Sequence, residues 1–348
     1  MLMQPSPRRQ ILLWAVGVIF LFLAVAIHSV AASAEKKLTI KLATLAPTGT
    51  SYHKSLLAMR EKWKQATDGA VDLNIYADGK LGGESDMVNL MGINSVQAAL
   101  LTAVGMAEIE RAVTGLQSMP MMFHDLAEVD YVGDRMRPML EKRLLEKGFV
   151  VLFWVDSGWV RFFSKKPLQT PDDLRKMKLF SWAGNTEQIE IYKAGRFNPV
   201  AIETADILPS LQTGLIDAVP MPPFFALAGQ MDSRAPHMLE LNWAPLVGAA
   251  VVTKKAWDKI PESARAALLK SSAEAGKEIK ARGRAESDES VAAMQKRGLS
   301  VHKVTHEVEL EWRKAAEALN PLIRGKIVPA DIFDEVQRLL NEFRAGRK

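Results

Sequence analysis

Apolar and polar residues follow two different periods along the first part of the chain. Residues 38–43 alternate between apolar and polar, as in a strand with one covered face. Residues 52–66 place their apolar side chains at helical spacing, and residues 71–76 alternate again before Asp78 and Gly79 interrupt the run. Because two strands joined by a helix form a crossover unit, this order predicts a parallel β-sheet.

The rest of the chain continues the alternation of strand and helix. A helix over residues 87–91 is predicted to precede a strand over residues 98–101, with Thr102 at its tip. The apolar run over residues 149–155 predicts a strand that is covered on both faces. Further predicted elements are a helix over 206–212, a strand over 216–219 and helices from Lys254 onward. The pattern predicts an α/β fold, and 348 residues are enough for two lobes.

The amino terminus has the features of a secretory signal. Arg8 and Arg9 precede an apolar run over residues 11–27, and residues 32–34 are the small residues that signal peptidase requires. We therefore expect residues 1–34 to be a signal peptide and the protein to be periplasmic. An uncleaved membrane anchor is the alternative, because the run is close to the minimum length of a spanning helix.

Composition excludes several classes of function. The chain has no cysteine, which excludes disulfides, thiolate catalysis and zinc sites built from cysteine. Its formal net charge is +5, and Arg8 and Arg9 contribute two of these charges within the expected signal. Such a mild excess requires no nucleic-acid partner.

No enzyme motif is present in the sequence. None of the six histidines lies in a metalloprotease or triad-like context, and no phosphate-binding loop or carboxylate pair stands out. His302 and His306 are four residues apart, but the alternating pattern around them predicts a strand, on which they are too distant to share one ion. We expect a protein that is not an enzyme and has no cofactor, although a cation bound together with the ligand is possible.

A central segment over residues 164–182 predicts a short capped helix and then a strand. Thr170 has the hydroxyl of a helix cap, Pro171 suits the first helical position, and Asp173 favours the positive helix end. The strand that follows carries Phe180 and Trp182 toward a strand-to-helix loop. Open α/β sheets bind ligands at such loops.

Two motifs in the chain resemble those of one transport family. Residues 164–179 are similar to the segment SKxPIxTPxDLxGLKIR of the solute receptors of TRAP transporters, and residues 211–218 resemble their LQTGxVDG motif. Residues 118–123 resemble the PFLF turn of the same receptors, and residues 256–261 resemble the start of their carboxy-terminal helices. The resemblance extends over about residues 38 to 345.

The resemblance implies a two-lobed receptor of the periplasmic-binding-protein type, with a ligand cleft between the lobes and helices at the carboxy terminus. Lobe I would comprise residues 35–157 and 246–287, and lobe II residues 158–245 and 288–348. The implied function is to capture a small organic acid and deliver it to the membrane subunits of a TRAP carrier. The alternatives are a sensor that presents its ligand to a membrane receptor and a periplasmic enzyme.

The family places a carboxylate-binding arginine where this chain has Phe180. The resemblance brings Glu84, Thr102, Met221 and either Trp159 or Val160 into the candidate ligand site. Strand alternation adds Trp182 on the face of Phe180, and Phe224 joins as part of an aromatic wall. The complete set is Glu84, Thr102, Trp159, Phe180, Trp182, Met221 and Phe224. For the aromatic members, packing in the core is the alternative. Arg161 is a candidate for a relocated clamp. Strand alternation turns it to the face opposite Val160, which predicts a solvated surface arginine unless a bulge re-aims it.

These substitutions change the expected ligand. An arginine fork binds a carboxylate through two parallel hydrogen bonds, whereas phenylalanine offers none. We therefore expect poor binding of simple dicarboxylates and a preference for a larger organic acid with an apolar or ring portion. Its carboxylate would be held by backbone N–H groups, by Thr102 or by a bound cation. If Phe180 packs inward, an unrecognised arginine performs the usual task instead.

Overall fold

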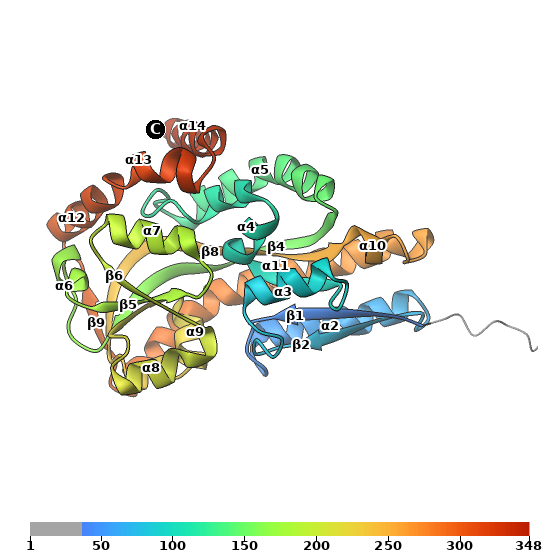
Figure 1. Cartoon of the computed structure of the whole chain (residues 1–348), viewed down its shortest axis with the longest axis horizontal. Coiled ribbons are helices and arrows are strands. Elements are labelled where there is room, and N and C mark those ends of the chain that lie inside the picture. The colour runs from blue at the N-terminus through green and yellow to red at the C-terminus, as the bar shows by residue number, and fades with distance from the viewer. Residues whose placement is uncertain (1–36, 348) are drawn as a thin grey trace, which may run out of the picture. The chain divides into compact units, whose positions relative to one another are not determined.

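One mixed β-sheet of nine strands runs through the protein, which we describe from a computed structural model over residues 37–347 (Figure 1). Its strand order is β2-β1-β3-β8-β4-β7-β5-β6, and β9 pairs with β8. The strands are β1 (Leu38–Thr44), β2 (Val71–Tyr76), β3 (Ala98–Thr102), β4 (Phe149–Ser164), β5 (Lys178–Trp182), β6 (Asn198–Ile202), β7 (Ala218–Met221), β8 (His237–Thr253) and β9 (Ser300–Lys303).

Two long antiparallel strands, β4 and β8, join the two lobes. Strands β1 to β3 lie on the β8 side and β5 to β7 lie on the β4 side, and we call these two halves of the sheet lobe I and lobe II. The β4–β8 register slips between Asp156 and Trp159, where Gly158 has a φ of +73°. That left-handed conformation suits glycine, so the crossing point is a local bend within a continuous strand.

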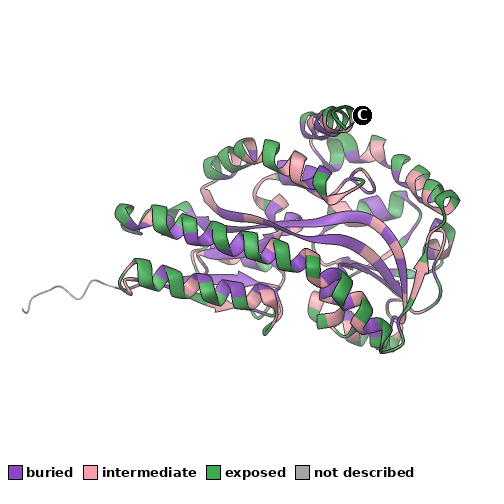
Figure 2. Ribbon diagram, turned by 180° about the vertical axis from the view of Figure 1, so that it is seen from behind, coloured by how far each residue is buried: buried purple, intermediate pink, exposed green. Residues whose placement is uncertain are grey.

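Thirteen α-helices are found in the described residues, and they surround this sheet. They are α2 (Ser51–Ala66), α3 (Glu84–Gly92), α4 (Ala103–Ile109), α5 (Leu126–Glu146), α6 (Pro171–Arg175), α7 (Thr186–Ala194), α8 (Ile207–Thr213), α9 (Pro223–Ala228), α10 (Lys254–Trp257), α11 (Glu262–Gln295), α12 (His306–Glu317), α13 (Asn320–Leu322) and α14 (Ala330–Ala345). The 34 residues of α11 contact α2 in lobe I, the crossing strand β4 and α9 in lobe II. Figure 2 shows α11 with buried residues along one side and exposed residues along the other. The longest helix therefore spans both lobes.

The predicted capped helix is present as α6. The Thr170 hydroxyl accepts a hydrogen bond from the Asp173 backbone N–H, and the Asp173 carboxylate accepts one from the Thr170 N–H at 3.0 Å. Pro171 occupies the first turn. This reciprocal capping fixes where the helix begins and brings β5 to its place in the sheet.

Some predicted elements differ in extent. Strand β4 continues to Ser164, beyond the apolar run at 149–155, because its second half is also covered on both faces in lobe II. Strand β7 begins at Ala218 instead of residue 216. A helix at Ser51–Ala66 and strands at Val71–Tyr76 and Ala98–Thr102 agree with the pattern.

The carboxy-terminal helices contact both lobes, whereas we expected residues 288–348 to belong to lobe II. On α12, Trp312 stacks on Phe162 of β4 and donates a hydrogen bond to the Gln169 carbonyl at 2.7 Å. On α14, Arg344 donates hydrogen bonds to Glu128 of α5, an element in the range that we expected for lobe I. An apolar face of α14 explains this placement, since Val336 and its neighbours on that face are buried.

The expected signal over residues 1–34 lies outside the described residues. Within residues 37–347, no helix combines the length and the apolar character that crossing a bilayer requires.

Candidate functional site

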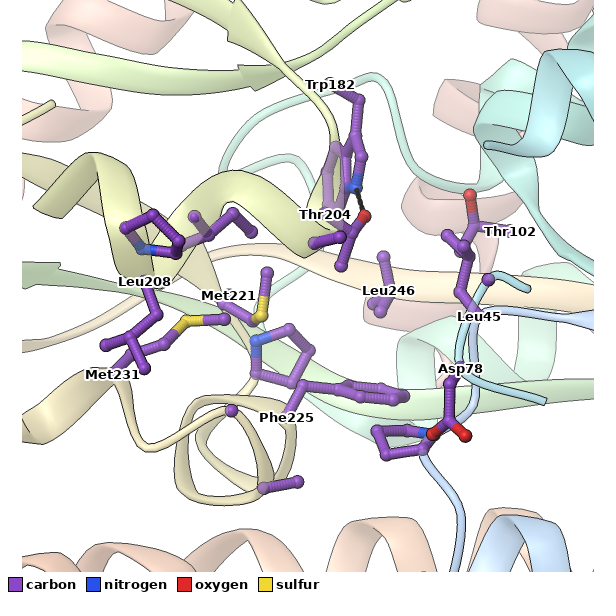
Figure 3. A pocket seen from close by; sticks show the side chains of 18 of the residues that line it. Leu45, Asp78, Thr102, Trp182, Thr204, Leu208, Met221, Phe225, Met231 and Leu246 are labelled. Atoms are coloured by element: carbon purple, nitrogen blue, oxygen red, sulfur yellow. Dashed lines mark hydrogen bonds between the residues drawn. The ribbon is translucent and has the colours of Figure 1, made fainter. Parts of the chain in front are cut away.

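A cavity of about 420 Å³ opens between residues of the two lobes (Figure 3). Lobe I contributes the loops that follow β1 and β2 and the end of β3, while lobe II contributes the ends of β5 and β7 and helix α9. Its lining is Leu45, Pro47, Asp78, Gly79, Gly82, Thr102, Trp182, Thr204, Ala205, Ile207, Leu208, Pro209, Met221, Pro222, Phe225, Ala228, Gly229, Met231 and Leu246. Carboxyl ends of strands thus meet where an α/β sheet is expected to hold its ligand.

The cavity wall is mostly apolar. Phe225, Met221 and Leu246 surround its centre in Figure 3, and Leu208 and Met231 lie on one side. Trp182 closes the upper side in that view, and its indole Nε1 donates a hydrogen bond to Thr204 Oγ1 at 3.1 Å. This bond fixes the indole plane as a wall of the cavity.

Asp78 is the single charged residue in this lining. Its carboxylate accepts hydrogen bonds from the Thr48 N–H at 2.7 Å and the Thr48 hydroxyl at 2.5 Å, and Lys80 Nζ lies 3.6 Å away. Burial alone would raise the pKa of Asp78, but the bonds from Thr48 and the charge of Lys80 outweigh it and lower this pKa. Asp78 is therefore ionised at neutral pH, and the cavity wall carries one negative charge and no positive one.

Thr102 and Glu84 form one hydrogen-bonded unit at the end of β3. The N–H and the hydroxyl of Thr102 both donate to the Glu84 carboxylate at 2.6 Å, and Gly105 N–H donates to it at 2.9 Å. Burial raises the pKa of Glu84, while these hydrogen bonds act in the opposite direction. The Thr102 hydroxyl also accepts from Val104 N–H, so it is already engaged within the protein.

The structure brings three of the predicted site residues together in the cavity wall, namely Thr102, Trp182 and Met221. Glu84 borders a separate space of about 50 Å³ beside it. Trp159 lies in the main core instead of the cavity, and Phe224 stacks on Tyr52 of α2 at 5.4 Å between ring centroids. Both are buried because strand β4 and helix α9 turn these side chains toward packed neighbours.

Phe180 also lies in the core, not in the cavity wall. It has no exposed surface and packs with Val219 and Met238 of the lobe II core. Its ring meets that of Trp182 edge to face, with centroids 5.1 Å apart. The two residues share one face of β5, but only Trp182 at the strand end reaches the cavity. Phe180 therefore supports Trp182 from behind.

Arg161 does not replace the missing clamp. The β4–β8 register slips again between Val160 and Phe162, next to this residue. Its guanidinium lies 4.0 Å from Glu240, and its side chain is only 13% exposed, so the expected solvated arginine is not observed. It is absent from the lining of the cavity.

Sequence reasoning missed several residues of the cavity wall. We predicted Phe224 as a site residue, but its neighbour Phe225 lines the cavity. The short helix that begins at Pro223 is the signal that could have indicated which of the two side chains faces the cavity. Leu208 and Leu246 lie on elements whose cavity-facing side depends on lobe packing, and no local pattern marks them.

The described residues contain no cluster of three or more potential metal ligands. His302 instead pairs with His237 on the neighbouring strand, with Nε2 and Nδ1 3.0 Å apart. His306 begins α12.

Comparisons with known proteins agree with this architecture. The family model of bacterial extracellular solute-binding proteins, family 7 (DctP), matches residues 42–323. The chain is 25% identical over 322 residues to the C4-dicarboxylate-binding periplasmic protein DctP of Rhodobacter capsulatus, covering 90% of this chain and 92% of that protein.

Solved structures of solute-binding proteins have the same fold, among them the following two. A TRAP periplasmic solute-binding protein from Sulfurospirillum deleyianum with bound succinate superposes with a TM-score of 0.80 at 20% identity, covering 87% of this chain and 99% of that one. One from Pseudomonas putida F1 with bound D-glucuronate gives a TM-score of 0.79 at 24% identity, covering 87% and 96%.

Proposed function

The chain belongs to the DctP family of bacterial extracellular solute-binding proteins, and we propose that it is the receptor of a TRAP-type carrier that captures an organic acid other than a simple dicarboxylate. Family membership makes it a solute-binding protein and not an enzyme. The observation that supports the proposed ligand is the charge of the cavity, whose wall includes Asp78 but neither lysine nor arginine.

A dicarboxylate would lose more than it gains in such a cavity. A carboxylate that leaves water without a cationic or multiply hydrogen-bonded partner loses several kcal/mol of solvation free energy. The ionised Asp78 adds repulsion. Apolar atoms gain about 25 cal/mol for each Å² that they bury, so an acid with a larger apolar or ring portion fits the wall of Phe225, Met221 and Leu246.

Capture would work by closure of the lobes. The bend of β4 at Gly158 is the crossing point, and a ligand that contacts both lobes stabilises the closed state by its differential affinity. The closed, loaded receptor is then the form that the membrane subunits of the carrier would accept.

A ligand screen on the purified exported protein tests this proposal. Succinate and malate are compared with branched and aromatic monocarboxylates by thermal shift and then by calorimetric titration, because a bound ligand raises the melting temperature. We expect the monocarboxylates to bind and the two dicarboxylates to leave the melting temperature unchanged. Tight binding of succinate would refute the proposed ligand class.

We also propose that the protein works in the periplasm after loss of residues 1–34. The charged, apolar and small-residue order of this segment supports the proposal. Intact-mass analysis of the periplasmic fraction should find a chain that begins at or near Glu35. Recovery of the full-length chain from membranes alone would contradict cleavage.

A further inference from the structure

A second, smaller cavity of about 50 Å³ lies against the first, with Trp182 and Leu246 in the walls of both. Its lining also draws on both lobes, and it contains polar side chains but no charged one. The polar groups that matter here are those of Gln117, Asn185 and Tyr192. A space of this size has room for a group such as a carboxylate.

Two side-chain amides in this cavity have a fixed orientation. Asn185 caps α7, and its Oδ1 accepts the Gln188 backbone N–H at 3.0 Å. Gln117 Oε1 accepts the Val247 backbone N–H at 2.9 Å. Because a backbone N–H can only donate, the side-chain oxygen of each amide must face it, and the NH₂ group must point away from it. Within residues 37–347, no acceptor is hydrogen-bonded to either NH₂ group.

Tyr192 supplies a third donor. Its side chain is only 2% exposed, yet its hydroxyl has no hydrogen-bond partner among the described residues. Burial is the cause that raises the pKa of Tyr192, so the hydroxyl keeps its proton. Buried tyrosine hydroxyls nearly always find a partner, and the small cavity is the space that this side chain borders.

We propose that this cavity, hereafter the amide chamber, binds the carboxylate of the ligand through the uncharged donors Gln117 Nε2, Asn185 Nδ2 and Tyr192 Oη, while the apolar part of the ligand fills the larger cavity. The inference rests on the proposed function and adds to it the three donors that take the place of the arginine clamp. Gln117 follows the 3₁₀ turn at Arg111–Leu116 of lobe I, whereas Asn185 and Tyr192 belong to lobe II, so one carboxylate would contact both lobes.

Neutral donors are sufficient for this task when they are held in place beforehand. Donors that are already oriented and screened from water stabilise an anion strongly, because they need no reorganisation when it arrives. The bonds to Gln188 and Val247 provide that orientation for the two amides. The single negative charge at Asp78 lies in the wall of the larger cavity and not in that of the amide chamber.

Nuclear magnetic resonance with three matched probes tests the proposal. Hydrocinnamate carries a phenyl ring and a carboxylate, hydrocinnamide replaces the carboxylate by a neutral amide, and propylbenzene has no polar head. The methyl signals of Met221 and Met231 report on the larger cavity, and the side-chain amide signals of Asn185 and Gln117 report on the amide chamber. We expect all three probes to shift the methyl signals and hydrocinnamate to shift the amide signals most.

Two substitutions test the donors directly. Asn185→Asp keeps the helix cap, because aspartate caps as well as asparagine, but it replaces the NH₂ donor by a negatively charged oxygen. We expect it to weaken hydrocinnamate binding at least roughly tenfold and to leave propylbenzene binding unchanged. Tyr192→Phe removes one hydroxyl and should weaken hydrocinnamate binding roughly threefold to tenfold. The exposed change Asn74→Asp is the matched control and should bind as the unmodified protein does.

The outcomes separate the two proposals. If the methyl signals respond to the probes while the amide signals do not, or if Asn185→Asp and Tyr192→Phe bind hydrocinnamate normally, the amide chamber is refuted and the larger cavity stands. If no probe shifts the methyl signals, the proposed function fails and the amide chamber fails with it.

Discussion

The ligand cavity and the crossing region of the two lobes place their charges in opposite ways. In the crossing region, Arg284 of α11 forms paired hydrogen bonds to Asp130 of α5 and to Asp156 of β4, at 2.7 to 2.9 Å, and Lys280 lies beside both carboxylates. The cavity wall has no basic residue. Arginine forks are therefore used to join elements of the scaffold, whereas the cavity that we propose for the ligand is lined by apolar and neutral polar residues and Asp78.

The two regions differ in the substitutions that they can tolerate. Asp156 is only 3% exposed and immediately precedes the bend of β4, so its pairing with Arg284 fixes the strand at the crossing point. Tyr52 strengthens the same region, since its hydroxyl bonds to Ser157 at 2.6 Å and its ring stacks on Phe224 of lobe II. A Cβ atom at Gly283 would lie 2.6 Å from that hydroxyl, so α11 can approach only through glycine.

The largest loss of stability is expected when a positive charge is placed in the apolar core of lobe II. Phe180→Arg places a guanidinium where the structure has no exposed surface, among the buried apolar side chains of the lobe II core. We expect a loss of several kcal/mol in the free energy of unfolding and no gain of a dicarboxylate clamp. Chemical denaturation of Phe180→Arg beside the apolar control Phe180→Leu measures this. A stable Phe180→Arg protein that binds succinate would mean that residue 180 faces the cleft.

The second-largest loss of stability is expected when the positive charge of Arg284 is removed from the crossing region. Arg284→Met leaves the buried Asp156 with a hydrogen bond from the Gly158 N–H at 3.2 Å and with Lys280, 3.6 Å away, as the one remaining cation among residues 37–347. We expect about 3 kcal/mol of destabilisation, because breaking a buried pair leaves a carboxylate poorly compensated. Urea denaturation of this variant is compared with that of Arg282→Met, an exposed residue on the same helix. Equal stability of the two variants would show that the Arg284 pairing is not important.

A smaller effect is expected when a cation is added to the cavity wall without burying it. Leu208→Arg puts a guanidinium at a half-buried position that lines the cavity. We expect roughly a tenfold gain in succinate affinity, since charge-assisted hydrogen bonds then become available. Calorimetric titration measures it, with Leu215→Arg on the exposed surface as control. If both variants bind succinate equally, the cavity is not where the acid binds.

The smallest effect is expected in the pH dependence of the stability. Burial alone would raise the pKa of Asp130, but the hydrogen bonds from Arg284 and Lys280 outweigh it and hold this pKa below its ordinary value. A carboxyl whose folded-state pKa is lowered stabilises the fold above its unfolded pKa of about 3.9 and loses that contribution as the pH falls through the folded value. We therefore expect the unmodified protein to lose stability below about pH 4 more steeply than Asp130→Asn. Melting curves across this range decide it, with Asp134→Asn as control on the same helix.

The sequence predicted well what depends on local pattern and less well what depends on the meeting of the two lobes. The capped helix at Thr170 and the strands of lobe I follow from residues that are neighbours in the chain. Which of Phe180 and Trp182 lines the cavity depends on how far β5 extends beyond the strands beside it. Strand alternation cannot reveal this, because both residues lie on the same face. The amide groups of Gln117 and Asn185 carry no motif, and 67 positions separate them in the sequence.

The crossing strands also determine when this chain can fold. In the sheet, β3 is bonded to β1 and β8, and β4 is bonded to β8 and β7, so among the strands of residues 37–347 only β8 links the first strands to the rest. Residues 237–253 must therefore leave the ribosome before either lobe can complete its sheet. Such distant strand pairing slows folding. Until β8 has emerged, the sheet lacks its linking strand in both lobes, and a chain that has not completed its fold is what transport across a membrane before folding requires.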